Sequence, residues 1–189
     1  MAVRPARRRR ARRRGVIALA LTAATASFAS VPGVRVRTYP VSGSDVPAIR
    51  ASLDAHGLLD GQDGTPVEAV THWRFTWRWP GTAAGPCRLA AAIVRFSATV
   101  TLPRLVGLDT LPPNVAANWR RYRASLEAHE ANHVRYAYAH RAEVLAAIRG
   151  ATCATADAAG QAVLRALIDH DRAYDRDTRH GASEGAVFP

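Results

Sequence analysis

The stretch of sequence that decides the fold spans residues 113–149 and reads PNVAANWRRYRASLEAHEANHVRYAYAHRAEVLAAIR. Its apolar, aromatic and histidine side chains recur every three or four residues, which is the spacing of one face of an α-helix. This stripe consists of Trp119, Tyr122, Leu126, His129, His133, Ala137, His140, Val144 and Ile148. The pattern predicts one continuous helix that ends at Gly150.

Two stretches ahead of this helix alternate apolar and polar side chains, as strands with one buried face do. Residues 73–79 carry three tryptophans and a phenylalanine on one side, and residues 92–102 continue the alternation after a connection rich in Pro and Gly. We expect an antiparallel pair in which the aromatic row forms sheet core, although such a row could also be a stacking platform for ligands. Residues 34–41 alternate in the same way and are expected to form an edge strand.

The remaining segments complete an α+β fold. A short helix should begin after the N-cap residue Asp45, and a second long helix is expected from about Thr155 to Tyr174. A polar tail over residues 175–189 should follow it. The predicted fold is a small antiparallel sheet packed on the long helix and on this second, C-terminal helix. A chain of 189 residues suits one domain with its own core, which we place at residues 30–189.

The basic excess of the chain lies at its N-terminus. Eight of the 26 basic residues are arginines within the first fourteen positions, and an apolar run and small residues up to Ala26 or Ala29 follow them. This is the order of a secretory signal, and Arg13 and Arg14 also fit a twin-arginine signal. We therefore expect residues 1–29 to be a signal peptide and the mature protein to be exported, either periplasmic or extracellular.

The composition of the mature chain argues against two classes of protein. Without the N-terminal arginines, 18 basic residues face 15 acidic ones, which leaves little excess charge for binding nucleic acid. The N-terminal apolar run falls short of the roughly 20 residues that a membrane-spanning helix needs, and no later segment is long enough. We expect no nucleic-acid partner and no stable membrane anchor after signal cleavage.

Cys87 and Cys153 are the only two cysteines. In an exported chain such a pair predicts a disulfide, which would stabilise the fold by about 4 kcal/mol by closing a loop of about 65 residues. The alternative is that both bind zinc, but neither has a CxxC or CxxH spacing. We therefore favour the disulfide.

The segment His129-Glu130-Ala131-Asn132-His133 has the spacing of a zinc-binding HExxH motif. Histidines four residues apart on a helix lie on one face and can bind a single Zn²⁺ ion through two nitrogens. Glu130 lies beside the open coordination position, where a carboxylate can act as general base toward water. Both histidines also fall on the stripe that faces the core, where an unpaired imidazole would be costly.

A catalytic zinc ion usually has a third protein ligand. His140 lies on the same stripe, but it is seven residues beyond His133, about 10.5 Å along a straight helix. The segment 174–181 is the better source: His180, followed by a flexible Gly181, is the first choice, and Asp175 is the alternative. Tyr174 could donate a hydrogen bond to a developing oxyanion. A solvated charged tail is the competing interpretation of this segment.

The chain also resembles a known family over roughly residues 39–189. The residues that carry the resemblance are Tyr39 to Gly43, Trp73, Trp77, Leu102, Pro103, Trp119 to Tyr122, His129, Glu130, His133, Tyr174, Asp175, Thr178, His180, Gly181 and Gly185 to Pro189. They are similar to DUF922, a family of bacterial secreted proteins described as zinc-dependent proteases with a zincin-like HExxH motif. The resemblance implies that segment 174–181 is a fixed feature, which favours His180 over a dispensable tail.

These observations lead to one expected function and one alternative. We expect a secreted zinc metallopeptidase in which His129, His133 and His180 hold Zn²⁺ and Glu130 is the general base. Its substrate would be a peptide or protein, with cell-wall peptides as a variant that export makes plausible. The alternative is a zinc-stabilised, non-catalytic binding or interaction domain of the cell envelope.

Overall fold

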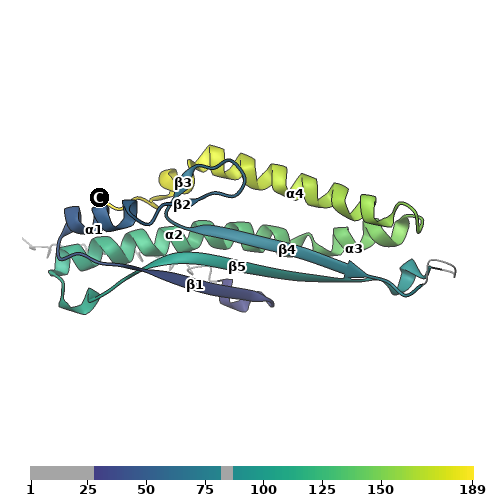
Figure 1. The fold of residues 1–189 in the computed structure, drawn as a ribbon, viewed down its shortest axis with the longest axis horizontal. Helices are drawn as coiled ribbons and strands as arrows, with labels where there is room; N and C mark the ends of the chain where they lie inside the picture. The colour runs from purple at the N-terminus through teal and green to yellow at the C-terminus, as the bar shows by residue number, and fades with distance from the viewer. Residues whose placement is uncertain (1–27, 82–86) are drawn as a thin grey trace, which may run out of the picture.

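The computed structural model describes residues 28–81 and 87–189 (Figure 1). The predicted signal peptide therefore lies outside the described residues, apart from its last two positions. The elements in chain order are η1 (Phe28–Ser30), β1 (Val34–Val41), α1 (Val46–Asp54), β2 (Leu58–Leu59), β3 (Pro66–Val67), β4 (Val70–Arg78), η2 (Leu89–Ala91), β5 (Ile93–Leu105), η3 (Leu108–Thr110), α2 (Pro113–Ala139), α3 (Arg141–Gly150), α4 (Ala156–Thr178) and η4 (Ala182–Glu184). The α+β class is confirmed.

The main sheet has three strands in the order β1-β5-β4. β4 and β5 pair antiparallel as predicted, from Val70 opposite Thr101 to Arg78 opposite Ile93. β1 is an edge strand, also as predicted, but it runs parallel to β5. The sheet is therefore mixed. A separate antiparallel hairpin, β2–β3, precedes β4.

The helices pack along one side of this sheet, with α2 and α3 following one another and α4 running back along the molecule toward the β2–β3 hairpin (Figure 1). The aromatic row of β4 faces these helices, so its assignment to the sheet core is confirmed: Phe75 is buried, and Trp73 and Trp77 are partly buried beside it. Gly160 of α4 permits the close approach of Trp77, because a Cβ atom at this position would lie 3.0 Å from the indole ring.

The long helix is bent rather than continuous. α2 ends at Ala139 and α3 begins at Arg141, with His140 at φ −86° and ψ 5° between them. Nδ1 of His140 lies 2.8 Å from the carbonyl oxygen of Tyr136, and the backbone N–H of His140 is shared between two carbonyls. A side chain that competes for an i−4 carbonyl in this way is a known cause of helix bending.

The second long helix extends one turn further than predicted, to Thr178. Residues 175–178 are therefore helical, and the prediction of a polar tail that starts at residue 175 is wrong. The segment beyond the helix is not fully solvated either, because Ala186 and Phe188 are buried, the latter against Trp119 and Tyr122. These contacts fix the end of the chain against α2.

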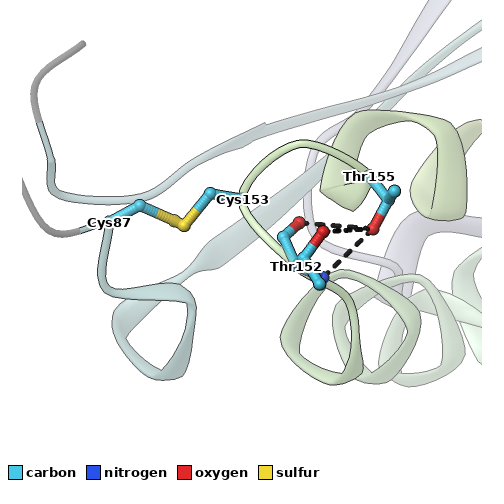
Figure 2. The surroundings of a disulfide bond; sticks show 4 residues. All are labelled: Cys87, Thr152, Cys153 and Thr155. Carbon is cyan, nitrogen blue, oxygen red and sulfur yellow. Dashed lines mark hydrogen bonds between the residues drawn. A yellow bond between two sulfur atoms is a disulfide. The ribbon is translucent and has the colours of Figure 1, made fainter. Parts of the chain in front are cut away.

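Cys87 and Cys153 form the predicted disulfide, which joins the connection before β5 to the turn between α3 and α4 (Figure 2). In that turn the side chain of Thr155 hydrogen-bonds to the backbone N–H and the hydroxyl of Thr152. The bridge lies at the end of the molecule where α4 begins. Within the described ranges, no helix combines the length and the apolar character needed to cross a bilayer.

Candidate metal centre

Buried polar chemistry is concentrated at one place in the described part of the chain. Every buried residue there that has a carboxylate or imidazole side chain belongs to one of two helices, α2 or α4. These residues are His129, Glu130, His133, Asp171 and Asp175. Burying such groups is costly unless they are paired or bind a metal ion, so their convergence calls for a partner.

Three of these residues bring their ligand atoms together. His129 and His133, one turn apart on α2, direct their Nε2 atoms toward each other at 3.4 Å. Asp175, in the last turn of α4, places Oδ1 3.1 Å from Nε2 of His129 and 3.0 Å from Nε2 of His133. One ligand atom from each residue lies within 4.8 Å of the other two.

A further carboxylate holds each imidazole on the opposite side of its ring. Nδ1 of His129 lies 2.9 Å from Oε2 of Glu184 in η4, and Nδ1 of His133 lies 3.1 Å from Oδ1 of Asp171 in α4. The indole N–H of Trp73 donates to Oδ2 of Asp171 at 2.6 Å. Carboxylates in this position favour the hydrogen on Nδ1 and leave the lone pair of Nε2 for a metal ion.

The spacing of the three ligand atoms fits a zinc ion. Bonds of 2.0–2.1 Å at tetrahedral angles separate neighbouring ligand atoms by about 3.3 Å. The distances of 3.0, 3.1 and 3.4 Å among His129, His133 and Asp175 lie around that value. With the hydrogens on Nδ1, three lone pairs would face one another, and a shared cation between them would remove the repulsion. These residues would hold the metal and leave a fourth position open.

Protons satisfy the same atoms when no metal is bound. Burial lowers the pKa of both histidines, but their contacts with carboxylates outweigh it, and Asp171 and Asp175 raise the pKa of His133 to about 10. The pKa of His129 is also raised, chiefly by Asp175. Burial raises the pKa of Asp175, but its hydrogen bonds with both histidines prevail, and that pKa falls well below its ordinary value. A metal ion must therefore displace protons from the imidazoles.

Glu130 lies in the same cleft as the three ligand atoms. Its carboxylate accepts a hydrogen bond of 2.7 Å from the hydroxyl of Thr71 in β4. Burial raises the pKa of Glu130, and the neighbouring His133 offsets part of that rise. The cleft has a volume of about 770 Å³ and is lined by β4, the β2–β3 hairpin, α2 and α4, with His129, Glu130, His133, Asp175 and His180 among its lining residues.

Asp175 and His180, the two candidates for the third ligand, lie at different places relative to the two imidazoles. Asp175, the alternative third ligand, contacts both imidazoles, whereas Nδ1 of His180 lies 3.9 Å from Oδ1 of Asp175 and is not part of the group of three. The Tyr174 hydroxyl donates to Glu184 at 2.9 Å. Its ring stacks on that of His129, and Tyr174 is not among the residues that line the main cleft. His140 packs on Tyr136, away from the three ligand atoms.

Sequence reasoning missed Asp171, Glu184 and Thr71. A signal for Asp171 was present, because the apolar spacing of α4 through Leu167 continues at four-residue steps into Asp171 and Asp175. That pattern predicts two carboxylates on the buried face of the helix. No local pattern marks Glu184 or Thr71, which reach the site only through the tertiary fold.

Comparison with known proteins assigns the chain to a family without giving it an activity. No curated protein and no solved structure matches this sequence. A family model does match, over residues 36–181, and it covers His129, His133 and Asp175. Its description is that of a bacterial protein of unknown function. The resemblance noted in the sequence is thereby confirmed, and the chain belongs to the DUF922 family.

Proposed function

We propose that this chain is an exported zinc-dependent hydrolase that cleaves peptide bonds. The observation that carries the proposal is the convergence of His129, His133 and Asp175 at the spacing of a tetrahedral zinc site, with a carboxylate behind each imidazole. A purely structural zinc site is usually closed by four protein ligands. A catalytic zinc site usually has three protein ligands and a fourth position that is open to a cleft, which is the arrangement here.

The chain's own residues supply the rest of the chemistry. Zinc in such a site lowers the pKa of water toward neutrality and polarises a carbonyl group. Glu130 lines the same cleft, and its raised pKa suits a group that takes a proton from water and returns it to the leaving amine near neutral pH. Thr71 holds this carboxylate by its hydrogen bond. Peptides are the substrates for which this pairing of zinc and glutamate is commonest, and cell-wall peptides are a variant that suits an exported enzyme.

The substitution Glu130→Gln tests the proposal. It keeps the size of the side chain and its hydrogen bond with Thr71 but removes the basic carboxylate. We expect hydrolysis of fluorogenic peptides to fall by about 10²- to 10⁴-fold, while zinc content stays the same. Glu127→Gln is the matched control, because Glu127 lies one turn away on α2 and pairs with Arg123.

The alternative, a zinc-stabilised binding domain, makes the opposite prediction. In that case the wild-type protein binds zinc but turns over no peptide, and Glu130→Gln changes neither property. A wild-type protein that binds no zinc at all would contradict both functions.

A further inference from the structure

A second group of ligand atoms lies beside the first and shares Asp175. One ligand atom each from Asp60, Asp175 and His180 lies within 4.8 Å of the other two. Nδ1 of His180 is 3.7 Å from Oδ2 of Asp60 and 3.9 Å from Oδ1 of Asp175. Charge-assisted hydrogen bonds have lengths of about 2.7–2.9 Å, so these atoms do not bond to one another. Their separations exceed the spacing of about 3.3 Å around a tetrahedral zinc ion by about 0.4–0.6 Å, so a shared cation would draw them closer together.

His180 also has carboxylates on both sides of its ring, with its two nitrogens reversed relative to those of His129 and His133. Nδ1 of His180 faces Asp60 and Asp175, while Nε2 on the other side of the ring lies 3.7 Å from Oδ2 of Asp63. Asp63 thus lies on the far side of the His180 ring, at a longer distance than the 2.9 Å between Glu184 and His129. A carboxylate behind the ring is the usual accompaniment of a histidine that binds a metal.

Asp175 has an oxygen to spare for a second ion. Its hydrogen bonds with His129 and His133 both use Oδ1, and among the described residues Oδ2 has no hydrogen-bond partner. The residue is only 7% exposed. Asp175 lines the cleft, and Oδ2 is not among the fully buried atoms that lack a partner, so a cation that enters the cleft can reach it. The β2–β3 hairpin brings Asp60 to this side of the residue.

We propose that the metal centre is binuclear, with a second divalent cation bound by Asp60 and His180 and bridged to the first by the carboxylate of Asp175. This inference rests on the proposed metal centre and extends it from one ion to two. Ions in two-metal hydrolase sites lie about 3.5–4 Å apart, a span that one carboxylate bridges. His180 is then a ligand of the second ion, and the β2–β3 hairpin forms part of the site.

The competing arrangement is a cluster of ion pairs in which protonated His180 is itself the cation. Arg172 and Arg179 line the same surface and add positive charge there. Metal stoichiometry separates the two arrangements without depending on activity. The full chain, stripped of metal and then saturated with zinc, should retain two zinc ions per chain after gel filtration, as counted by elemental analysis.

Asp60→Asn is the decisive variant, because the amide keeps the oxygen that caps the N–H of Gln62 at 2.7 Å and loses the charge. We expect it to retain one zinc ion per chain. Asp63→Asn should keep both sites and weaken the second by about 10- to 100-fold. Asp177→Asn is the matched control on an exposed position of α4 and should retain two ions.

Cobalt provides an independent measurement. If Asp175 bridges the ions, a second equivalent of Co²⁺ should couple magnetically to the first, and the electron paramagnetic resonance signal should grow less than twofold.

One zinc ion in both wild type and Asp60→Asn would overturn the second site but leave the proposed function standing. If Asp60→Asn binds no zinc, Asp60 is a ligand of a single site, and the proposed second site is also overturned. No zinc in the wild type would contradict the proposed function itself.

Discussion

At the scale of single residues, Gly181 shows how tightly the candidate metal centre is packed. Its φ of +81° lies in the left-handed region, and a Cβ atom there would approach the Cγ atom of His129 to 2.9 Å and the Cβ atom of Ala186 to 3.1 Å. The sequence suggested that this glycine supplies flexibility next to His180. In the structure it instead allows the chain after α4 to pack against a ligand ring.

We therefore expect Gly181→Ala to displace His129 and to weaken zinc binding. Overpacking at such a contact costs about 1–3 kcal/mol, in addition to the strain of a left-handed alanine. The measurements are zinc affinity by competition with a chromophoric chelator and the free energy of unfolding. Gly57→Ala is the control, because Gly57 also has a positive φ but has no atom within 4 Å of the added Cβ. Equal effects of the two variants would contradict the steric argument.

At the scale of elements, the disulfide and the metal centre lie at opposite ends of α4. Ala156, at the start of α4, is 19 residues from Asp175, which corresponds to about 28 Å along the helix axis. The bridge clamps the β4–β5 connection onto the α3–α4 turn (Figure 2). It can therefore stabilise the fold without touching the ligands.

Replacing both cysteines with serine should lower the free energy of unfolding by about 4 kcal/mol, because the unfolded chain regains the entropy of a loop of 66 residues. Zinc stoichiometry should remain that of the wild type. Denaturant unfolding and elemental analysis of the same preparation test both statements. Loss of zinc from a variant that is still folded would show that the two ends of α4 are coupled.

The elements also show how far the sequence predicts this molecule. The alternation of apolar and polar side chains located β4 and β5, and apolar side chains every three or four residues located α2, α3 and α4. Both patterns are local, and each reports which face of the element is buried. The parallel orientation of β1 could not be predicted, since alternation is the same for either direction of a strand. His129, Glu130 and His133 were found as a spaced motif. Asp171 and Glu184 were missed because they reach the imidazoles only through the packing of α4 and η4 on α2.

At the scale of the whole molecule, protonation of the centre couples metal binding to folding. The pKa of His133 is about 10 in the folded chain without metal and should return to about 6.5 on unfolding. A raised pKa contributes stability that is fully present below pH 6.5 and is lost as the pH rises through 10. The chelator-treated protein should therefore lose stability between pH 7 and pH 9, by up to about 1.4 kcal/mol per pH unit.

Zinc should remove this dependence on pH. With the metal bound, His133 carries no transferable proton in the folded state, and above pH 6.5 it carries none in the unfolded state. Melting temperatures measured across pH 7–9, with and without buffered zinc, test this expectation. The pH dependence should also flatten in His133→Gln without metal. A metal-free wild type whose stability rises over this range would contradict the assigned ion pairs.

The hydrogen bond from Trp73 to Asp171 gives the molecule an optical reporter of its own state. The indole N–H donates to the carboxylate that contacts His133, so any change in charge on that imidazole reaches a fluorophore through a single side chain. The N–H of Trp77 instead donates to Asp157, near the other end of α4. We therefore expect the emission of Trp73, rather than that of Trp77, to change when a metal ion binds the candidate centre.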